Sequence, residues 1–173
     1  RAFCIVATKS IVLLLLAILL LFPRSLSAQE NAPNDETAQI AARLLGAINQ
    51  TRQQAGLAPM QAHPLLAQAA QSHASDMASH RLFSHTGSDG SSVHMRTARI
   101  GYTSGKGVTE NWVTTGSTDS ALAWWMNSYV HRNNILNPKW TEAGVGVHRD
   151  PANGLRIFVV VFGGGGQSGG NQA

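Results

Sequence analysis

The chain of 173 residues contains a single cysteine, Cys4, which stands ahead of a long apolar run. Beyond that run there is no cysteine, so the rest of the chain cannot be a fold held together by disulfides, as many small secreted eukaryotic modules are. The position of Cys4 also argues against a lipoprotein signal, whose cysteine follows the apolar run. A domain of ~140 residues can bury enough surface for one core without disulfides.

Charged residues are also scarce, at 13% of the chain. Three of the 13 basic residues (Arg1, Lys9 and Arg24) lie in the first 28 residues, and none of the nine acidic residues does. The remainder is therefore close to neutral, with a net charge of +1, and contains no basic cluster. This pattern gives no indication of a nucleic-acid partner.

One hydrophobic run stands out, the twelve residues Ile11–Phe22. It is shorter than the ~20 residues of an ordinary membrane-spanning helix. With Lys9 before it and the small residues Ser27 and Ala28 after it, it is typical of a secretory signal peptide. We expect a signal peptide at 1–28 and a secreted or periplasmic mature chain that does not span a membrane. An uncleaved anchor helix is the alternative.

The mature chain alternates helical and extended patterns. Polar residues 29–36 predict a linker, and residues 164–173, rich in glycine, predict a flexible tail. We expect helices at 37–55, from Pro64, at 92–100 and from Ser117 or Thr118, and extended segments at 108–113, 142–148 and 155–162. The last of these is apolar on both alternating faces, so it predicts a sheet covered by helices on both sides.

Residues Trp124–Val147 combine a scaffold with a candidate site. The segment contains three of the four tryptophans, and we interpret all four, including Trp112, as core residues. His131 follows the adjacent pair Trp124 and Trp125, at the point where helical chemistry changes to strand chemistry. Its imidazole can titrate near neutral pH or bind a metal.

A second set of histidines lies on the helix that begins at Pro64. His73, Asp76 and His80 are spaced at i, i+3 and i+7, which could present them to a metal. The other residues on that face are apolar. We therefore favour the interpretation that His73 is a hydrogen-bonded core histidine and that the other two are surface groups.

Several motifs in order along the chain resemble one family. They are the Asn49–Arg52 segment, Phe83-Ser84-His85, Glu110-Asn111-Trp112, His131 with the Asn-Asn-Ile-Leu-Asn-Pro run after it, and Thr141–Gly146. Together they resemble the CAP superfamily (cysteine-rich secretory, antigen 5 and pathogenesis-related 1 proteins), most closely its cysteine-free bacterial branch. The resemblance covers residues 37–163. It implies an α+β fold, a three-layer α-β-α sandwich with a central, mostly antiparallel sheet.

The family likeness also implies a site. Family members carry two histidines and two acidic residues in a cleft that can bind a divalent cation. His85, Glu110 and His131 match three of these groups, and Ser128 stands where the second acid is expected. Two imidazoles and one carboxylate suit Zn²⁺ with a water in an open position. We expect Asn111, Ser128, Gly144 and Gly146 to line the same cleft.

Three functions remain open from the sequence. The first is a binding module that holds a divalent cation together with a lipid-like or cell-wall-derived ligand, without catalysis. The second is a metal-dependent hydrolase of peptide or cell-wall material, although no His-Glu-x-x-His, Gly-x-Ser-x-Gly or cysteine nucleophile is present. The third is a surface interaction protein in which His85, Glu110 and His131 form a structural network. We expect a monomer in each case.

Overall fold

The computed structural model describes residues 32–167, and the predicted signal peptide lies outside this range. The chain divides between Ala32 and Pro33, and the account below concerns the unit that starts at Pro33. None of the helices in the described range is long and apolar enough to cross a membrane.

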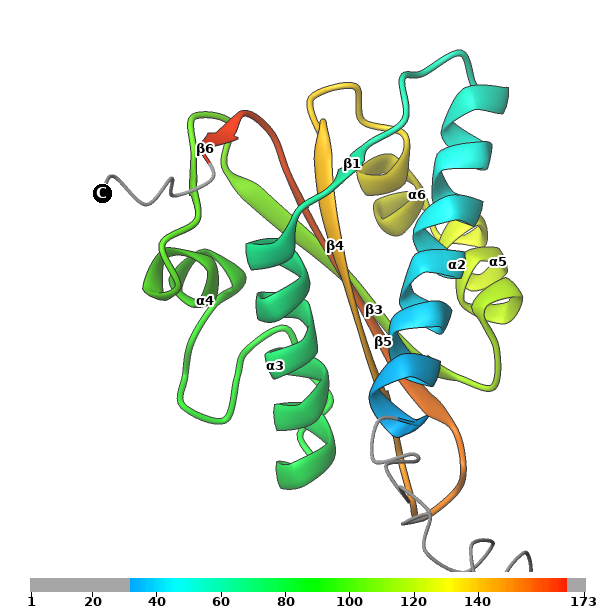
Figure 1. The fold of residues 1–173 in the computed structure, drawn as a ribbon, viewed down its shortest axis with the longest axis vertical. Coiled ribbons are helices and arrows are strands. Elements are labelled where there is room, and N and C mark those ends of the chain that lie inside the picture. Colours follow the sequence, from blue (N-terminus) through cyan, green and yellow to red (C-terminus); the bar gives the residue numbers. More distant parts are fainter. Residues whose placement is uncertain (1–31, 168–173) are drawn as a thin grey trace, which may run out of the picture. The chain divides into compact units, whose positions relative to one another are not determined.

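The described part of the chain contains five helices and six strands (Figure 1). The helices are α2 (Ala32–Gln54), α3 (Pro64–His80), α4 (Val93–Arg99), α5 (Thr118–Asn127) and α6 (Tyr129–Ile135). The strands are β1 (Gln61–Ala62), β2 (Thr103–Ser104), β3 (Val108–Thr115), β4 (Glu142–Arg149), β5 (Arg156–Gly163) and β6 (Gly166–Gln167).

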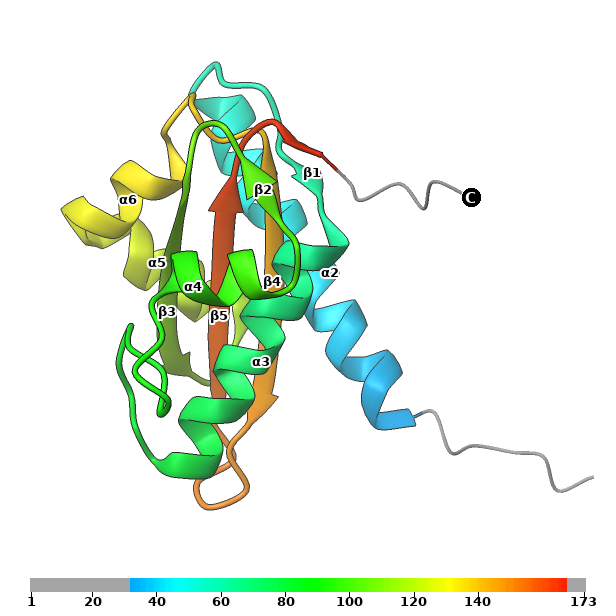
Figure 2. The same cartoon turned by 90° about the vertical axis from the view of Figure 1, so that its left-hand side faces the viewer.

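Four of the strands form the central sheet, in the order β1-β4-β5-β3. Its long strands are antiparallel, and only the short pairing of β1 with β4 is parallel. Helices α3 and α4 cover one face, and α2, α5 and α6 cover the other (Figures 1 and 2). The expected three-layer fold with a mostly antiparallel sheet is therefore confirmed.

The core lies on both faces of β5. Ile157, Val159 and Val161 pack with α3, whereas Phe158, Val160 and Phe162 pack with α2, α5 and α6. All six side chains are fully buried. The pattern of two apolar faces thus predicted correctly that β5 lies in the middle of the sandwich.

Buried Arg52 ties the end of α2 to the segment after α6. Its guanidinium donates hydrogen bonds to the backbone carbonyls of Ala58, Ile135, Asn137 and Trp140, at 2.7–3.1 Å. Burial lowers the pKa of Arg52. The planar fork of arginine explains why this position of the Asn49–Arg52 motif holds arginine, since lysine cannot reach four carbonyls at once.

Two expected boundaries differ from the structure, and the structure adds a short helix that the sequence patterns did not predict. Helix α2 begins at Ala32, inside the predicted linker 29–36, because proline is tolerated in the first turn of a helix. The predicted tail 164–173 starts too early, since β6 pairs with β2 and Ser104 donates to the carbonyl of Gly164. His131 lies in a separate short helix, α6, because the backbone is extended at Ser128.

The expectation for Gly144 and Gly146 was wrong, because these residues of β4 lie under α3. A Cβ on Gly144 would come within 1.9 Å of the backbone nitrogen of Ala67, and one on Gly146 within 2.2 Å of that of Gln71. The two glycines therefore allow α3 to pack directly on the strand. They contribute to the sandwich, not to a site around His85 and His131.

Candidate functional site

The candidate site centres on Glu110, whose side chain points from β3 towards α3 and α4. It is 5% exposed and accepts hydrogen bonds from Arg96 Nη2 at 2.7 Å and His85 Nδ1 at 2.9 Å. His73 Nε2 lies 3.6 Å from the same carboxylate. Burial alone raises the pKa of Glu110, but the His85 hydrogen bond and the Arg96 charge outweigh it and hold the pKa below its usual range.

His85 lies at the surface on the loop that follows α3. Its Nδ1 donates to Glu110, which leaves Nε2 as the ring nitrogen that does not bond to this carboxylate. The ring lies edge to face with Trp112, with centroids 6.1 Å apart. Glu110 thus orients an exposed imidazole, and Arg96 supports the same loop by donating to the backbone carbonyl of His85 at 3.2 Å.

His131 is held by its own partners, separately from Glu110. Its Nδ1 is 2.7 Å from the Ser128 hydroxyl, and its backbone carbonyl accepts a hydrogen bond from Asn111 at 3.0 Å. Burial and the nearby His85 both lower the pKa of His131, which favours a neutral ring. Ser128, where an acid was expected, therefore serves as the hydrogen-bond partner that orients this imidazole.

Asn111 supports the site from behind. Its side chain is fully buried and bonds to both His131 and Asn134, so it joins β3 to α6. The expectation that Asn111 lines a ligand cleft is corrected accordingly. Since a buried amide must satisfy its hydrogen bonds internally, this residue fixes the position of α6 relative to the sheet.

Trp124 contradicts the interpretation of all four tryptophans as core residues. Trp125 and Trp140 are buried, whereas Trp124 is 50% exposed and its ring contacts His131 at a centroid distance of 4.8 Å. Tyr129 and Val130, at the start of α6, are also largely exposed. The exposed Trp124 ring and the half-buried His131 ring thus lie together at the surface, and we call this pair the aromatic patch.

The three residues expected to bind metal do not form a metal cluster. No group of three or more His, Cys, Asp or Glu side chains in residues 32–167 is arranged to hold a metal ion. Both Glu110 oxygens are already hydrogen-bonded, to Arg96 and His85. Two imidazoles remain, which is fewer than the three protein ligands of a usual catalytic zinc site. The residues present do not fit the predicted three-ligand centre.

The sequence analysis missed Arg96 and did not foresee that His73 lies close to Glu110. Arg96 was not recognised, because a single arginine in a short helix gives no signal of an ion pair with a distant strand. His73 was interpreted correctly as a hydrogen-bonded core histidine, with Nε2 3.0 Å from the Ser84 carbonyl. Its closeness to Glu110 follows only from the packing of α3 on the central sheet, which the sequence does not specify.

Comparison with known proteins gives the family. The model of the CAP, or cysteine-rich secretory protein, family matches residues 45–162. The chain belongs to the CAP family. YkwD of Bacillus subtilis is 35% identical over 101 residues, which are 57% of this chain and 38% of that protein. The chain therefore spans well under half the length of this curated relative.

Solved structures show the same CAP fold. An extracellular protein of Bacillus anthracis containing an SCP domain matches with a TM-score of 0.69 and 23% identity, over 79% of this chain and 44% of that chain. A cysteine-rich secretory protein of Staphylococcus aureus matches with a TM-score of 0.61 and 24% identity, over 73% and 38%. An outer surface protein of Borrelia burgdorferi matches with a TM-score of 0.64 and 20% identity, over 71% and 90%.

Proposed function

We propose that this CAP domain is a binding module that acts outside the cell and recognises a cell-wall-derived glycan at the aromatic patch. The observation that carries the proposal is the exposed ring of Trp124 beside the half-buried imidazole of His131. A sugar presents an apolar face of C–H groups and a rim of hydroxyls. An exposed indole suits the face, and the His131 ring suits the rim. An extracellular location agrees with the descriptions of the Bacillus anthracis and Staphylococcus aureus relatives.

The contacts of Glu110 support binding over hydrolysis. A general base needs an oxygen free to take a proton, but the carboxylate of Glu110 is buried and both of its oxygens already accept hydrogen bonds, from Arg96 and from His85. These contacts suit a group that positions the His85 loop. They do not suit a group that moves protons during a reaction. This favours the binding module over the metal-dependent hydrolase among the functions that the sequence left open.

Calorimetric titration of the purified domain with soluble peptidoglycan fragments tests the proposal. We expect Trp124→Ala to weaken binding at least tenfold. Leu155→Ala provides a matched control, because Leu155 is also an exposed hydrophobic residue, 38% accessible, but lies in the turn before β5. This control should bind as the wild type does. Equal affinity of the wild type and Trp124→Ala, or binding to phospholipid vesicles and not to glycan, would overturn the proposal.

A further inference from the structure

Strand β4 runs along one side of the central sheet, between α2 and α3 (Figure 1). The short strand β1 pairs only with Glu142 and Ala143, whereas β5 pairs with β4 along its whole length. Within residues 32–167, no strand therefore lies beside the outer edge of β4 from Gly144 to Arg149. An open edge of this kind presents backbone N–H and C=O groups that can pair with another extended chain.

Hydrogen bonds show which residues of β4 direct their backbone groups outward along this edge. The carbonyl of Ala143 accepts a backbone hydrogen bond at 3.0 Å from the side of β1. The backbone N–H and C=O of Val147 both bond to the side-chain amide of Gln71, at 3.0 Å each. Residues of an antiparallel strand alternate in the direction of their backbone groups, so Val145 and Arg149 point outward as well. The amide of Gln71 thus takes the place of a neighbouring strand at one residue only.

Two adjoining cavities follow this edge and form one groove. Their volumes are about 320 and 720 Å³, and both are lined by Ala41 of α2, Ala67 of α3 and Val145 of β4. The smaller cavity is lined mainly by small and apolar residues, which include Leu45 and Pro64. Small side chains on both helices leave space beside the strand. Neither residue of the aromatic patch lines the groove, so it is separate from the proposed glycan site.

Arg149, at the end of β4, gives one end of the groove a positive charge. It lines the larger cavity and is exposed. None of the ion pairs within residues 32–167 involves it. The other polar residues of this cavity carry no acidic group; they are Thr37, Gln68, Gln71 and His148. An acidic group is therefore the complementary partner at this end of the groove.

We propose that the β4 edge binds an extended, acidic peptide segment of another protein, which adds a strand beside Gly144–Arg149. The peptide exchanges backbone hydrogen bonds with Val145 and, after displacing the amide of Gln71, with Val147. One of its carboxylates pairs with Arg149, and its small apolar side chains fill the groove. An acyl chain would leave the outward backbone groups without partners, whereas a peptide satisfies them. A segment of about six residues spans the edge, because each residue of β4 faces one residue of the added strand.

Titration of the purified protein with the peptide acetyl-Glu-Val-Ala-Val-Ala-Glu-amide tests this inference. An acid stands at each end of this probe, so that one of them can reach Arg149 in either strand direction. We expect saturable binding in calorimetry and slower hydrogen exchange of the Val145 amide. The same peptide with methyl groups on its four central amide nitrogens cannot donate to the strand and should produce neither effect. Absence of saturable binding, equal binding of the methylated probe, or unchanged exchange at Val145 would overturn the inference.

Three substitutions locate the bound peptide. Gln71→Ala removes the group that competes for Val147, so it should tighten binding about fivefold, the effect of about one net hydrogen bond. Gln68→Ala is the matched control and should leave the affinity unchanged, because Gln68 lines the same cavity from α3 but bonds to no residue of β4 within residues 32–167. Arg149→Gln should weaken binding about threefold, as is usual for the loss of an exposed ion pair.

A second copy of the chain and an acyl chain are the other occupants that the test distinguishes. Protection of the Val145 amide that rises with protein concentration alone, together with a dimer in analytical ultracentrifugation, would assign the edge to a second copy. Saturable binding of decanoate, without binding of the peptide, would assign the groove to an acyl chain. Either result would overturn the inference, and both come from the wild-type protein, so they decide it even if a variant fails to fold.

Discussion

Arg96 of α4 and Glu110 of β3 form a buried ion pair with an Nη2–Oε2 distance of 2.7 Å. Fourteen residues separate them in the chain, and the pair joins the outer helix to the sheet. The second carboxylate oxygen accepts from His85, so one charged contact positions both α4 and the loop that carries the exposed imidazole. The stability of the fold and the geometry of the site are therefore linked through Glu110.

Removing one partner of this pair should destabilise the domain strongly. Glu110→Gln leaves the guanidinium of Arg96 buried without a counter-charge, which typically costs about 3–5 kcal/mol. We expect a loss of this size in the free energy of unfolding, measured by urea denaturation. Arg96→Met should have a similar effect, because it leaves the buried charge of Glu110 without its guanidinium partner.

The double variant isolates the interaction itself. With Glu110→Gln and Arg96→Met combined, neither buried charge remains, so the loss should be clearly smaller than the sum of the two single losses. Strictly additive losses would show that the two side chains do not stabilise one another.

The glycines of β4 should tolerate no side chain. A Cβ at Gly146 would meet the backbone of Ala70 and Gln71, and backbone cannot move aside cheaply. Gly146→Ala should lower the free energy of unfolding of the domain by about 1–3 kcal/mol or more, because overpacking a core usually costs this amount. Gly46→Ala is the matched control, since a Cβ there meets nothing within 4 Å inside α2, and it should stabilise by up to about 1 kcal/mol. Thermal unfolding of both variants checks the opposite signs.

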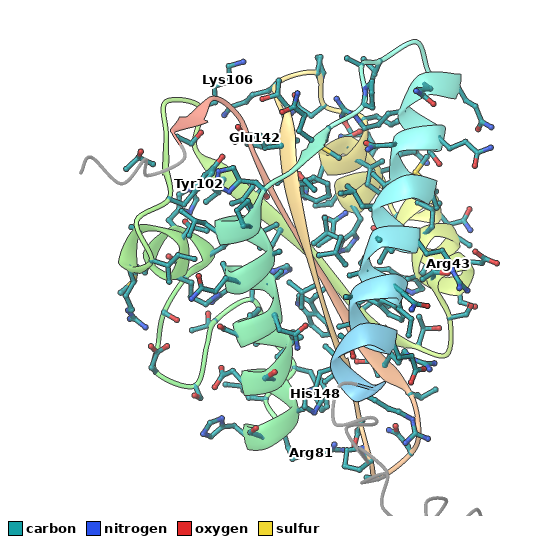
Figure 3. All side chains as sticks on the ribbon, viewed as in Figure 1. Arg43, Arg81, Tyr102, Lys106, Glu142 and His148 are labelled. Atoms are coloured by element: carbon teal, nitrogen blue, oxygen red, sulfur yellow. The ribbon has the colours of Figure 1, made fainter. Side chains whose placement is uncertain are left out.

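Acid should weaken the contact between Asp150 and Arg81, which joins the turn after β4 to the end of α3. Arg81 Nη1 donates to Asp150 Oδ2 at 2.6 Å, and this bond, with one from the Ala152 backbone, lowers the pKa of Asp150. Figure 3 labels Arg81, which follows α3, and His148, which lies near the end of β4, the strand that leads into this turn.

A lowered folded-state pKa means that Asp150 stabilises the fold above its ordinary pKa of about 3.9 and ceases to do so as the pH falls through the folded value. The difference in unfolding free energy between the wild type and Asp150→Asn should be largest at neutral pH and should shrink below about pH 4. Urea denaturation across pH 2–7 measures it, and a difference that does not change with pH would contradict this interpretation of the ion pair.

Zinc should bind weakly, because only the two imidazoles of the predicted set are free to act as ligands. In calorimetric titration we expect weak binding of Zn²⁺ that is lost in the His85→Ala, His131→Ala double variant. Tight binding of one Zn²⁺ per domain would contradict this prediction. It would mean that Glu110 leaves Arg96 and becomes a third zinc ligand beside the two imidazoles.

Most of the fold could be predicted from the sequence, because it depends on local patterns. The apolar period of α2, the proline that opens α3 and the two apolar faces of β5 each specify one element. The early start of α2 and the pairing of β6 with β2 were missed. Both depend on features that hydrophobic periodicity does not report, namely a tolerated Pro33 and the hydrogen bonds around Gly164.

The candidate site was predicted only in part. The motifs identified His85, Glu110 and His131, and the structure places Glu110 against His85. The role of Arg96 and the exposure of Trp124 were not predictable from spacing. The first depends on how α4 lies on the sheet, and the second on which side of α5 faces the core, since that side buries Trp125 and leaves the adjacent Trp124 exposed.

These adjacent tryptophans provide the most direct test of the proposed glycan site. The indole of Trp125 is buried and donates to the Trp112 carbonyl, whereas Trp124 is exposed beside His131. The measurement is a ¹H–¹⁵N spectrum recorded during titration with soluble peptidoglycan fragments. We predict saturable shifts of the Trp124 indole and the His131 ring, with little change at Trp125. Shifts confined to other parts of the domain, or none at saturating ligand, would contradict the proposed function.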